Sequence, residues 1–173
     1  MTTTIDLLED AFTRIRDTVR RAAGELTDVQ LTARVAPEAN TIAWLVWHLT
    51  RVQDDHVAEL AGTPQQWESG GWRERFALPF AADATGYGHS SEEVGQVAGA
   101  GVTSESLVGY HEAVYAATVA FLRSLATGAE ARLDTVVDEN WTPPVTMAVR
   151  LVSVVSDDLQ HAGQAAFVRG LVA

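Results

Sequence analysis

Cysteine and lysine are both absent from this sequence of 173 residues. Without cysteine, the chain can form no disulfide, bind no metal through a thiolate and supply no thiol nucleophile. Without lysine, it cannot form a Schiff base through a side-chain amine. The lack of cysteine fits a reducing compartment. Any sulfur chemistry in which this protein takes part therefore needs a thiol from outside the chain.

Positive charge is also scarce, since 12 basic residues face 23 acidic ones and the net charge is −11. The basic residues, all arginine, are scattered, which argues against a nucleic-acid partner because phosphate binding needs clustered positive charge. The N-terminus has no basic region before an apolar run, so we expect no secretory signal. No apolar stretch approaches the ~20 residues of a membrane-spanning helix. We expect a cytoplasmic protein with no membrane association and one domain over residues 1–173.

Four stretches of the chain carry apolar residues at helical spacing. The expected helices begin near Thr4 or Asp6, at Asn40 or Thr41, at Ser104 and near Val145. Their expected ends are Gly24, Gly62, Gly128 and Arg169. Residues 63–103 are rich in glycine and aromatics, and short helices are expected near 64–69 and 91–98. No strand pattern stands out. The prediction is an all-α four-helix bundle with a long crossover between helices two and three.

The last predicted helix carries a polar stripe in an otherwise apolar sequence. Its members step by three or four and share one face: they are Ser153, Asp157, Gln160, His161 and Gln164. Asp157 and His161 are one turn apart, about 6 Å along the axis, so a carboxylate oxygen and an imidazole nitrogen can meet at one metal ion. The alternative is that the stripe is the solvated side of the helix. Apolar residues cover most of the remaining circumference, which favours an internal cavity.

The second predicted helix offers two histidines, His48 and His56. They are eight residues apart, about 12 Å along the helix, so one mononuclear site cannot easily take both. On a helical wheel His56 lies nearer the centre of the apolar stripe and His48 lies at its margin. Either can instead be a hydrogen-bonded core histidine, and the pattern favours neither as a ligand. Asp55 can orient a ligating histidine, join the site directly or be solvated.

Two further histidines lie outside these helix faces. His89 ends the flexible stretch Thr85-Gly-Tyr-Gly-His89, which can fold over a site. His111, near the start of the third predicted helix, is expected at the surface or its boundary. No Ser-His-Asp set can be argued from spacing, and the Gly-x-Gly at 86–88 lacks a strand–turn–helix context.

Two segments together resemble the DinB superfamily of four-helix-bundle metalloproteins. They are residues 39–49, ANTIAWLVWHL, and residues 157–171, DDLQHAGQAAFVRGL. His48 occupies the place of the histidine that follows an aromatic–aliphatic run on helix two. Asp157 and His161 occupy the places of the last-helix pair, and Gly163-Gln164 follow as in the family. Residues 71–76 and 86–89 also look like members of this group, and the resemblance spans most of the chain. In two departures, Asp157 is shorter than the common Glu, and Gln160 replaces a frequent His or Arg.

The resemblance implies an up-up-down-down bundle that forms a homodimer. It implies a divalent ion, Zn or Ni, bound by His48, Asp157 and His161, with water in the remaining positions. The nearest functional kin is the metal-binding domain of mycothiol-dependent maleylpyruvate isomerase, in which the metal activates a low-molecular-weight thiol. We therefore expect a thiol-dependent transferase or isomerase that uses mycothiol, or a similar thiol, and a small electrophile.

Several other residues are expected around this site. Trp72, Tyr87 and His89 of the crossover would wall the pocket. Arg169 would hold a substrate carboxylate at the pocket edge or be a surface charge at the helix end. Asp55 and Gln164 would support the ligands. The alternative function is a non-catalytic metal-binding stress or interaction protein, because fold alone does not give function.

Overall fold

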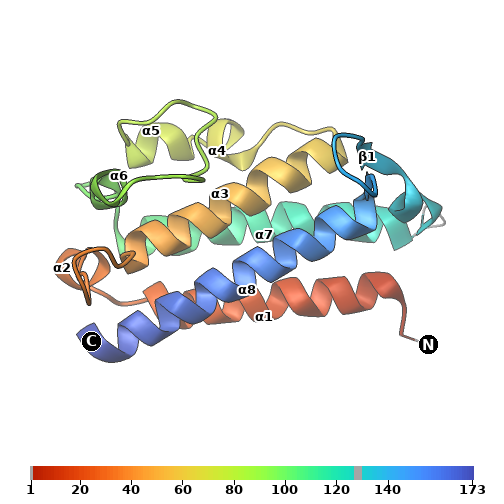
Figure 1. The fold of residues 1–173 in the computed structure, drawn as a ribbon. Helices are drawn as coiled ribbons and strands as arrows, with labels where there is room; N and C mark the ends of the chain where they lie inside the picture. Colours follow the sequence, from red (N-terminus) through yellow and green to blue (C-terminus); the bar gives the residue numbers. More distant parts are fainter. Residues whose placement is uncertain (1, 127–129) are drawn as a thin grey trace.

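Four long helices lie side by side in the computed structural model, which describes residues 2–126 and 130–173. They are α1 (Thr4–Ala23), α3 (Ile42–Ala61), α7 (Ser104–Ala126) and α8 (Met147–Val172) (Figure 1). The shorter helices are α2 (Asp28–Leu31), α4 (Gln66–Ser69), α5 (Trp72–Phe76), α6 (Ser91–Gln96) and the 3-10 helix η1 (Glu130–Asp134). The expected all-α class is confirmed. Gly128, the expected end of the third long helix, lies outside the described residues.

Threonines cap the starts of three long helices. The hydroxyls of Thr3, Thr41 and Thr146 each accept a hydrogen bond from a backbone N–H in the first turn, which satisfies an amide that has no partner inside the helix. Gly62 ends α3 in the left-handed conformation, at φ 67°, which glycine adopts without strain. The start of α8 was expected at Val145, but this residue is in a strand and the helix begins at Met147.

The helix directions differ from the expected order. Thr50 bonds to His111 and Gln53 bonds to Thr118, so α3 and α7 run parallel. Figure 1 shows α1 and α8 running the opposite way. The expected up-up-down-down order is wrong, and the order here is up-down-down-up. Up-up-down-down needs a long connection after the first helix, whereas the long crossover here, residues 62–103, follows α3 and returns the chain to the end from which α3 started.

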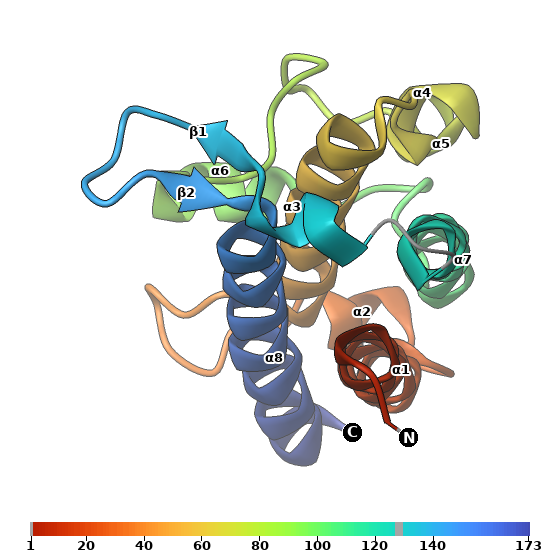
Figure 2. The same cartoon turned by 90° about the vertical axis from the view of Figure 1, so that its right-hand side faces the viewer.

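The crossover covers the side of α3 that faces away from α1 (Figures 1 and 2). The Asp54 carboxylate of α3 accepts hydrogen bonds from the backbone N–H groups of Gln66 and Trp67, at 2.8 and 2.7 Å. The Trp67 ring packs on Tyr110 of α7, with ring centroids 5.4 Å apart. The short helices expected near 64–69 and 91–98 are confirmed, and α5 lies between them. These contacts bury α3 from the crossover side as well as from the bundle.

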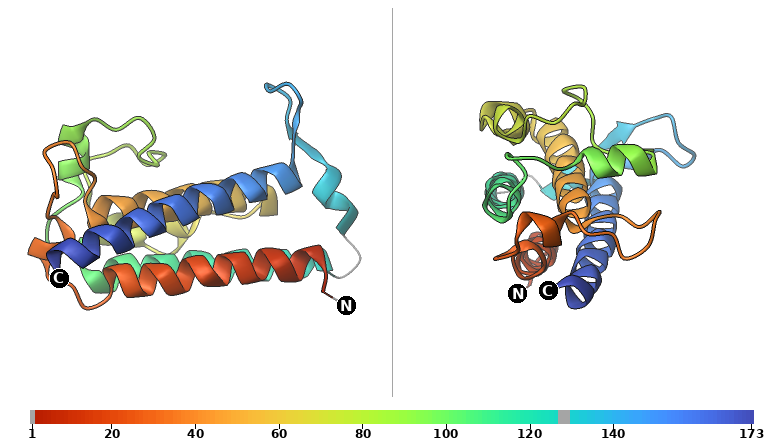
Figure 3. Two further views of the ribbon diagram at one scale, coloured as in Figure 1. Left: turned by 60° about the horizontal axis from the view of Figure 1, so that its bottom comes forward. Right: turned by 90° about the vertical axis from the view of Figure 1, so that its left-hand side faces the viewer.

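A small antiparallel hairpin joins α7 to α8, although no strand was expected. It pairs β1 (Val136–Asp138) with β2 (Val145–Thr146) and projects beyond the start of α8 (Figure 3). Strands this short are too brief to show the alternation by which a strand is predicted. Arg150 of α8 ties the hairpin down through a bond of 3.1 Å from Nη2 to the Asp138 carboxylate.

The core lies between the four long helices. Its largest fully buried apolar side chains include Phe12, Ile15, Leu45 and Leu122, whereas Trp47, also fully buried, packs on Trp67 and Phe80 on the crossover side of α3. His111 is buried in this core, so the expected surface or boundary position is wrong. Its side chain faces α3, because its Nδ1 bonds to the Thr50 hydroxyl at 3.1 Å. Across the described part of the chain, every helix is too short or too polar to cross a membrane.

Candidate metal centre

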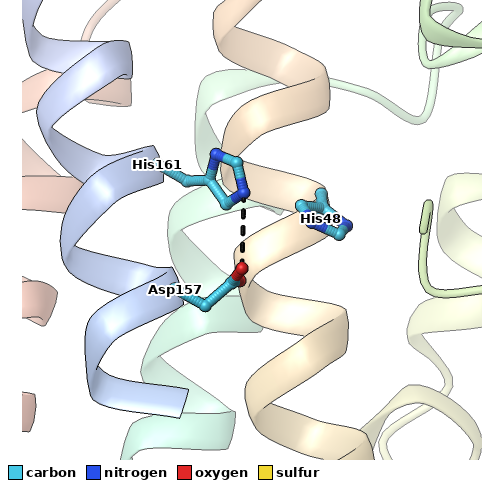
Figure 4. A group of neighbouring side chains, drawn as sticks. All are labelled: His48, Asp157 and His161. Atoms are coloured by element: carbon cyan, nitrogen blue, oxygen red, sulfur yellow. Dashed lines mark ion pairs between the residues drawn. The ribbon is translucent and has the colours of Figure 1, made fainter. Parts of the chain in front are cut away.

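His48, Asp157 and His161 come together between α3 and α8 (Figure 4). One ligand atom from each side chain lies within 4.8 Å of those of the other two. His161 Nε2 is 3.6 Å from Asp157 Oδ1, across one turn of α8. The His48 and His161 rings meet edge to face, with centroids 4.9 Å apart. The antiparallel pairing of α3 with α8 therefore brings the helix-two histidine to the Asp-x-x-x-His pair.

The outer nitrogen of each imidazole is hydrogen-bonded to a carbonyl oxygen. His48 Nδ1 donates to the Thr85 backbone carbonyl at 2.6 Å, and His161 Nδ1 donates to Gln164 Oε1 at 2.9 Å. A carbonyl oxygen only accepts, so both Nδ1 atoms carry a hydrogen, and in the neutral form of each ring Nε2 keeps a lone pair.

The carboxylate completes a donor set that fits a metal ion. Asp157 Oδ2 is buried and has no hydrogen-bond partner. A buried polar atom without a partner is costly and rare in folded proteins. Two imidazole nitrogens and one carboxylate oxygen are the mixed donors that Zn and similar divalent ions accept. The residues present therefore fit such an ion.

Burial and neighbouring charges set the protonation of the three side chains. His48 is 5% exposed, and burial lowers the pKa of its imidazole, which keeps it neutral. Burial alone would raise the pKa of Asp157, but the bond with His161 and the charge of protonated His161 outweigh it, and the pKa is lowered. The bond to Asp157 raises the pKa of His161. A metal ion must displace the proton that this pair shares.

Trp44 packs against both histidines. Its ring stacks on His48 at 4.5 Å between centroids and an interplanar angle of 16°, and it meets His161 edge-on at 6.1 Å. Trp44 lies one turn before His48 on α3 and therefore shares its face. Trp44 lies within the motif that carries the family resemblance, and its four-residue spacing from His48 points to a place at the site, although Trp44 was not among the expected site residues.

A cavity of about 370 Å³ opens beside two of the three side chains, His48 and Asp157. Its lining consists of His48, Val52, Asp55, His56, Thr85, Tyr87, Ser153, Val154 and Asp157. Ser153 and Asp157 of the polar stripe thus face this cavity. Gln160 of the same stripe is exposed and bonds back to Ser156 of its own helix. The stripe therefore serves partly as a cavity wall and partly as a solvated surface.

The helical wheel misjudged the two histidines of α3. His48, placed at the margin of the apolar stripe, is buried, whereas His56, placed near its centre, is only half-buried. His56 Nδ1 accepts a hydrogen bond of 2.9 Å from Arg150 Nη1. The wheel failed because the crossover covers a second face of α3, so the apolar stripe alone does not define the buried side.

Three of the expected surrounding residues lie near the site in different ways. Asp55 lines the cavity, but it accepts a bond from Gln65 Nε2 at 2.7 Å and not from a ligand histidine. Tyr87 also lines the cavity and is 93% exposed. His89 accepts a bond from Trp44 Nε1 at 3.3 Å and stacks on Trp47, outside the group formed by His48, Asp157 and His161. The Thr85 carbonyl holds the outer nitrogen of His48. From the sequence, Asp55 was a residue that could orient this histidine.

Two expected pocket residues lie elsewhere. Trp72 packs on Tyr110 at 5.7 Å and on Phe76 at 6.4 Å, and it is not part of the cavity lining. Arg169 donates from Nη1 to the backbone carbonyls of Ala22 and Gly24, at 3.4 and 2.7 Å. These carbonyls lie at the C-terminal end of α1, where helical partners are lacking. Arg169 therefore joins α8 to α1 and does not reach the cavity edge.

The up-down-down-up bundle, with two histidines and an aspartate between α3 and α8, belongs to the DinB-like all-α class. A model of the mycothiol S-transferase family matches residues 7–173, and the chain belongs to that family. A crystal structure of a conserved protein from Enterococcus faecalis is similar, with a TM-score of 0.88 and 31% sequence identity. The match covers 99% of this chain and 98% of that one. A search of curated proteins found no match.

Proposed function

We propose that this protein is a metal-dependent transferase or isomerase that uses mycothiol, or a similar low-molecular-weight thiol, as its nucleophile. His48, Asp157 and His161 hold one divalent ion, Zn or Ni. The observation that carries the proposal is the set of three donor groups within 4.8 Å, in a chain of the mycothiol S-transferase family. The absence of cysteine supports it, because the reacting sulfur must come from a second molecule.

The residues around the ligands prepare the site for a thiol. A divalent ion held there lowers the pKa of a coordinating thiol, so that a thiolate is available near neutral pH. His48 and His161 bond through Nδ1 to the Thr85 carbonyl and to Gln164. These bonds leave the Nε2 lone pairs of the neutral rings available to the ion. Trp44 covers the rings of His48 and His161 on one side and limits the approach of water from that side.

The cavity beside the ligands is the proposed place for the electrophile. Val52 and Val154 give it apolar walls, and Ser153 adds a hydroxyl. Because an arginine only donates, the bond from Arg150 to His56 Nδ1 leaves the hydrogen of a neutral His56 on Nε2. Burial and the charge of Arg150 lower the pKa of His56 and favour this neutral form. His56 is then a hydrogen-bond donor for an acceptor group of the second substrate.

Metal analysis of protein purified without a histidine tag tests the site. We expect about one divalent ion per chain in the wild type and almost none in His48→Ala or His161→Ala, because each variant leaves only two ligands. His56→Ala on the same helix is the control and is expected to keep its metal. A wild-type content near zero, unchanged in the ligand variants, would contradict the metal centre.

A thiol-consumption assay tests the reaction separately. Mycothiol, bacillithiol and glutathione would each be offered with a panel of electrophiles. We expect turnover with mycothiol that is lost in His48→Ala. Bound metal without thiol-dependent turnover across the panel would instead favour the non-catalytic metal-binding protein.

A further inference from the structure

The backbone of residues 84–86, called here the 84–86 clamp, lies directly against the His48 ring. The Thr85 carbonyl accepts the bond from His48 Nδ1. Gly86 follows at φ 94°, and a Cβ built on it would lie 2.9 Å from His48 Nδ1 and 2.9 Å from the Trp47 ring. Only a residue without a side chain fits there, because the conformation and the close approach both exclude a Cβ.

Arg51 fixes the clamp from the same helix face as His48. The arginine side chain is fully buried, and its Nε donates to the Ala84 carbonyl at 3.1 Å. Since His48 and Arg51 are three positions apart on α3, their side chains point the same way and bind consecutive carbonyls of one segment.

A second nitrogen of the Arg51 guanidinium, Nη1, is held by other groups, whereas Nη2 is buried without a hydrogen-bond partner. Nη1 donates to Gln65 Oε1 at 2.8 Å and to the Tyr110 hydroxyl at 3.3 Å. The guanidinium also lies over the Trp67 ring, 5.0 Å from its centroid. The planar, permanently charged group can satisfy several acceptors in one fixed geometry. Arg51 is therefore a rigid anchor for a clamp segment that forms no helix or strand.

We infer that Arg51 and the 84–86 clamp are a positioning device that locks His48 in its Nδ1–H tautomer and keeps Nε2 free as a metal-ligand atom. The tautomer of a histidine is set by the bond that its other nitrogen makes. A fixed carbonyl at Nδ1 excludes the Nε2–H tautomer. It also prevents the rotation of the ring that would take Nε2 away from Asp157 and His161. The metal part of this inference rests on the proposed function, whereas the tautomer does not.

The first test is the tautomer of His48 in metal-free wild-type protein, read from imidazole nitrogen chemical shifts by NMR. We expect the hydrogen on Nδ1. A hydrogen on Nε2 would overturn the proposal. If the protein takes up no metal but His48 shows the Nδ1–H form, the clamp is supported and the proposed function fails.

The second test compares Gly86→Ala with Gly88→Ala by chelator competition for Zn. Both glycines have positive φ, 94° and 75°, but a Cβ at Gly88 meets nothing within 4 Å. The pair therefore shares the backbone strain and differs in contact with His48. We expect Gly86→Ala to bind Zn about 10- to 100-fold more weakly and Gly88→Ala to bind like the wild type. Folded Gly86→Ala with wild-type affinity and tautomer would contradict the inference. If Gly86→Ala does not fold, the tautomer of His48 in the wild-type protein still tests the inference.

A third variant, Arg51→Lys, tests the anchor. Lysine keeps the charge but cannot bind the Ala84 carbonyl and Gln65 through a planar fork. We expect weaker Zn binding and a mixture of His48 tautomers, a readout that general loss of stability would not produce. A single Nδ1–H form with unchanged Zn affinity would show that Arg51 does not position His48.

Discussion

At the scale of single residues, the core holds a histidine with no access to water. His111 is 1% exposed, its Nδ1 bonds to Thr50, and its Nε2 has no hydrogen-bond partner. Burial, assisted by the charge of Arg16, lowers the pKa of His111 to about 3. The folded protein therefore keeps this imidazole neutral under conditions in which an exposed histidine is protonated.

The buried His111 predicts a loss of stability in acid. Its pKa is near 6.5 in the unfolded chain and about 3 in the folded one. Between these values the unfolded state binds more protons, so stability falls as the pH falls below 6.5. We expect this residue to account for about 1 kcal/mol of unfolding free energy per pH unit in that range. Urea unfolding of the wild type and His111→Gln at pH 7.5 and pH 5 measures it. Parallel pH dependence of the two proteins would contradict the prediction.

At the scale of elements, α3 is the helix on which the molecule is organised. The bundle packs on one side of it and the crossover on another (Figure 2). The Asp54 carboxylate accepts hydrogen bonds from two backbone N–H groups at the start of α4 and from the Tyr110 hydroxyl of α7. Burial raises the pKa of Asp54, and these bonds oppose that shift. One buried carboxyl group thus joins α3 to α4 and α7.

Removal of the Tyr110 hydroxyl is expected to weaken this junction. The hydroxyl donates to Asp54 Oδ2 at 2.8 Å and accepts from Arg51 at 3.3 Å. Tyr110→Phe leaves both buried groups short of a partner, and we expect a loss of about 1–3 kcal/mol of unfolding free energy. Tyr87→Phe is the control, because the Tyr87 side chain is exposed. Equal stability of the two variants by urea unfolding would contradict the role of the junction.

At the scale of the whole molecule, the proposed metal centre joins two helices that are far apart in the chain. His48 comes from α3 and the other two ligands come from α8. An ion bound there favours the folded state, because the unfolded chain does not hold these groups together. The homodimer implied by the family resemblance stays a prediction.

Metal binding should therefore raise the stability of the whole protein. At a free Zn concentration about 100 times the dissociation constant, we expect about 2.7 kcal/mol of added unfolding free energy. His161→Ala is expected to gain almost none. Thermal unfolding with Zn and with a chelator measures the effect. Equal stabilisation of the wild type and His161→Ala would mean that Zn binds elsewhere.

The sequence by itself determined the features that depend on neighbours along the chain. Apolar spacing and capping residues such as Thr41 and Gly62 define helices because their hydrogen bonds are local. The pairing of Asp157 with His161 follows for the same reason, since residues four apart share a helix face.

Only the tertiary structure decided which groups from distant segments meet. The pattern alone could not choose His48 over His56, because the covering of α3 by the crossover depends on long-range packing. Nor could the pattern show that the Thr85 carbonyl bonds to His48, because every residue has a backbone carbonyl and the sequence does not mark which group each carbonyl binds. The helix directions likewise depend on where the crossover returns the chain. The Asp157–His161 pair on α8 is thus a local property of the sequence, and its meeting with His48 and the 84–86 clamp is a property of the fold.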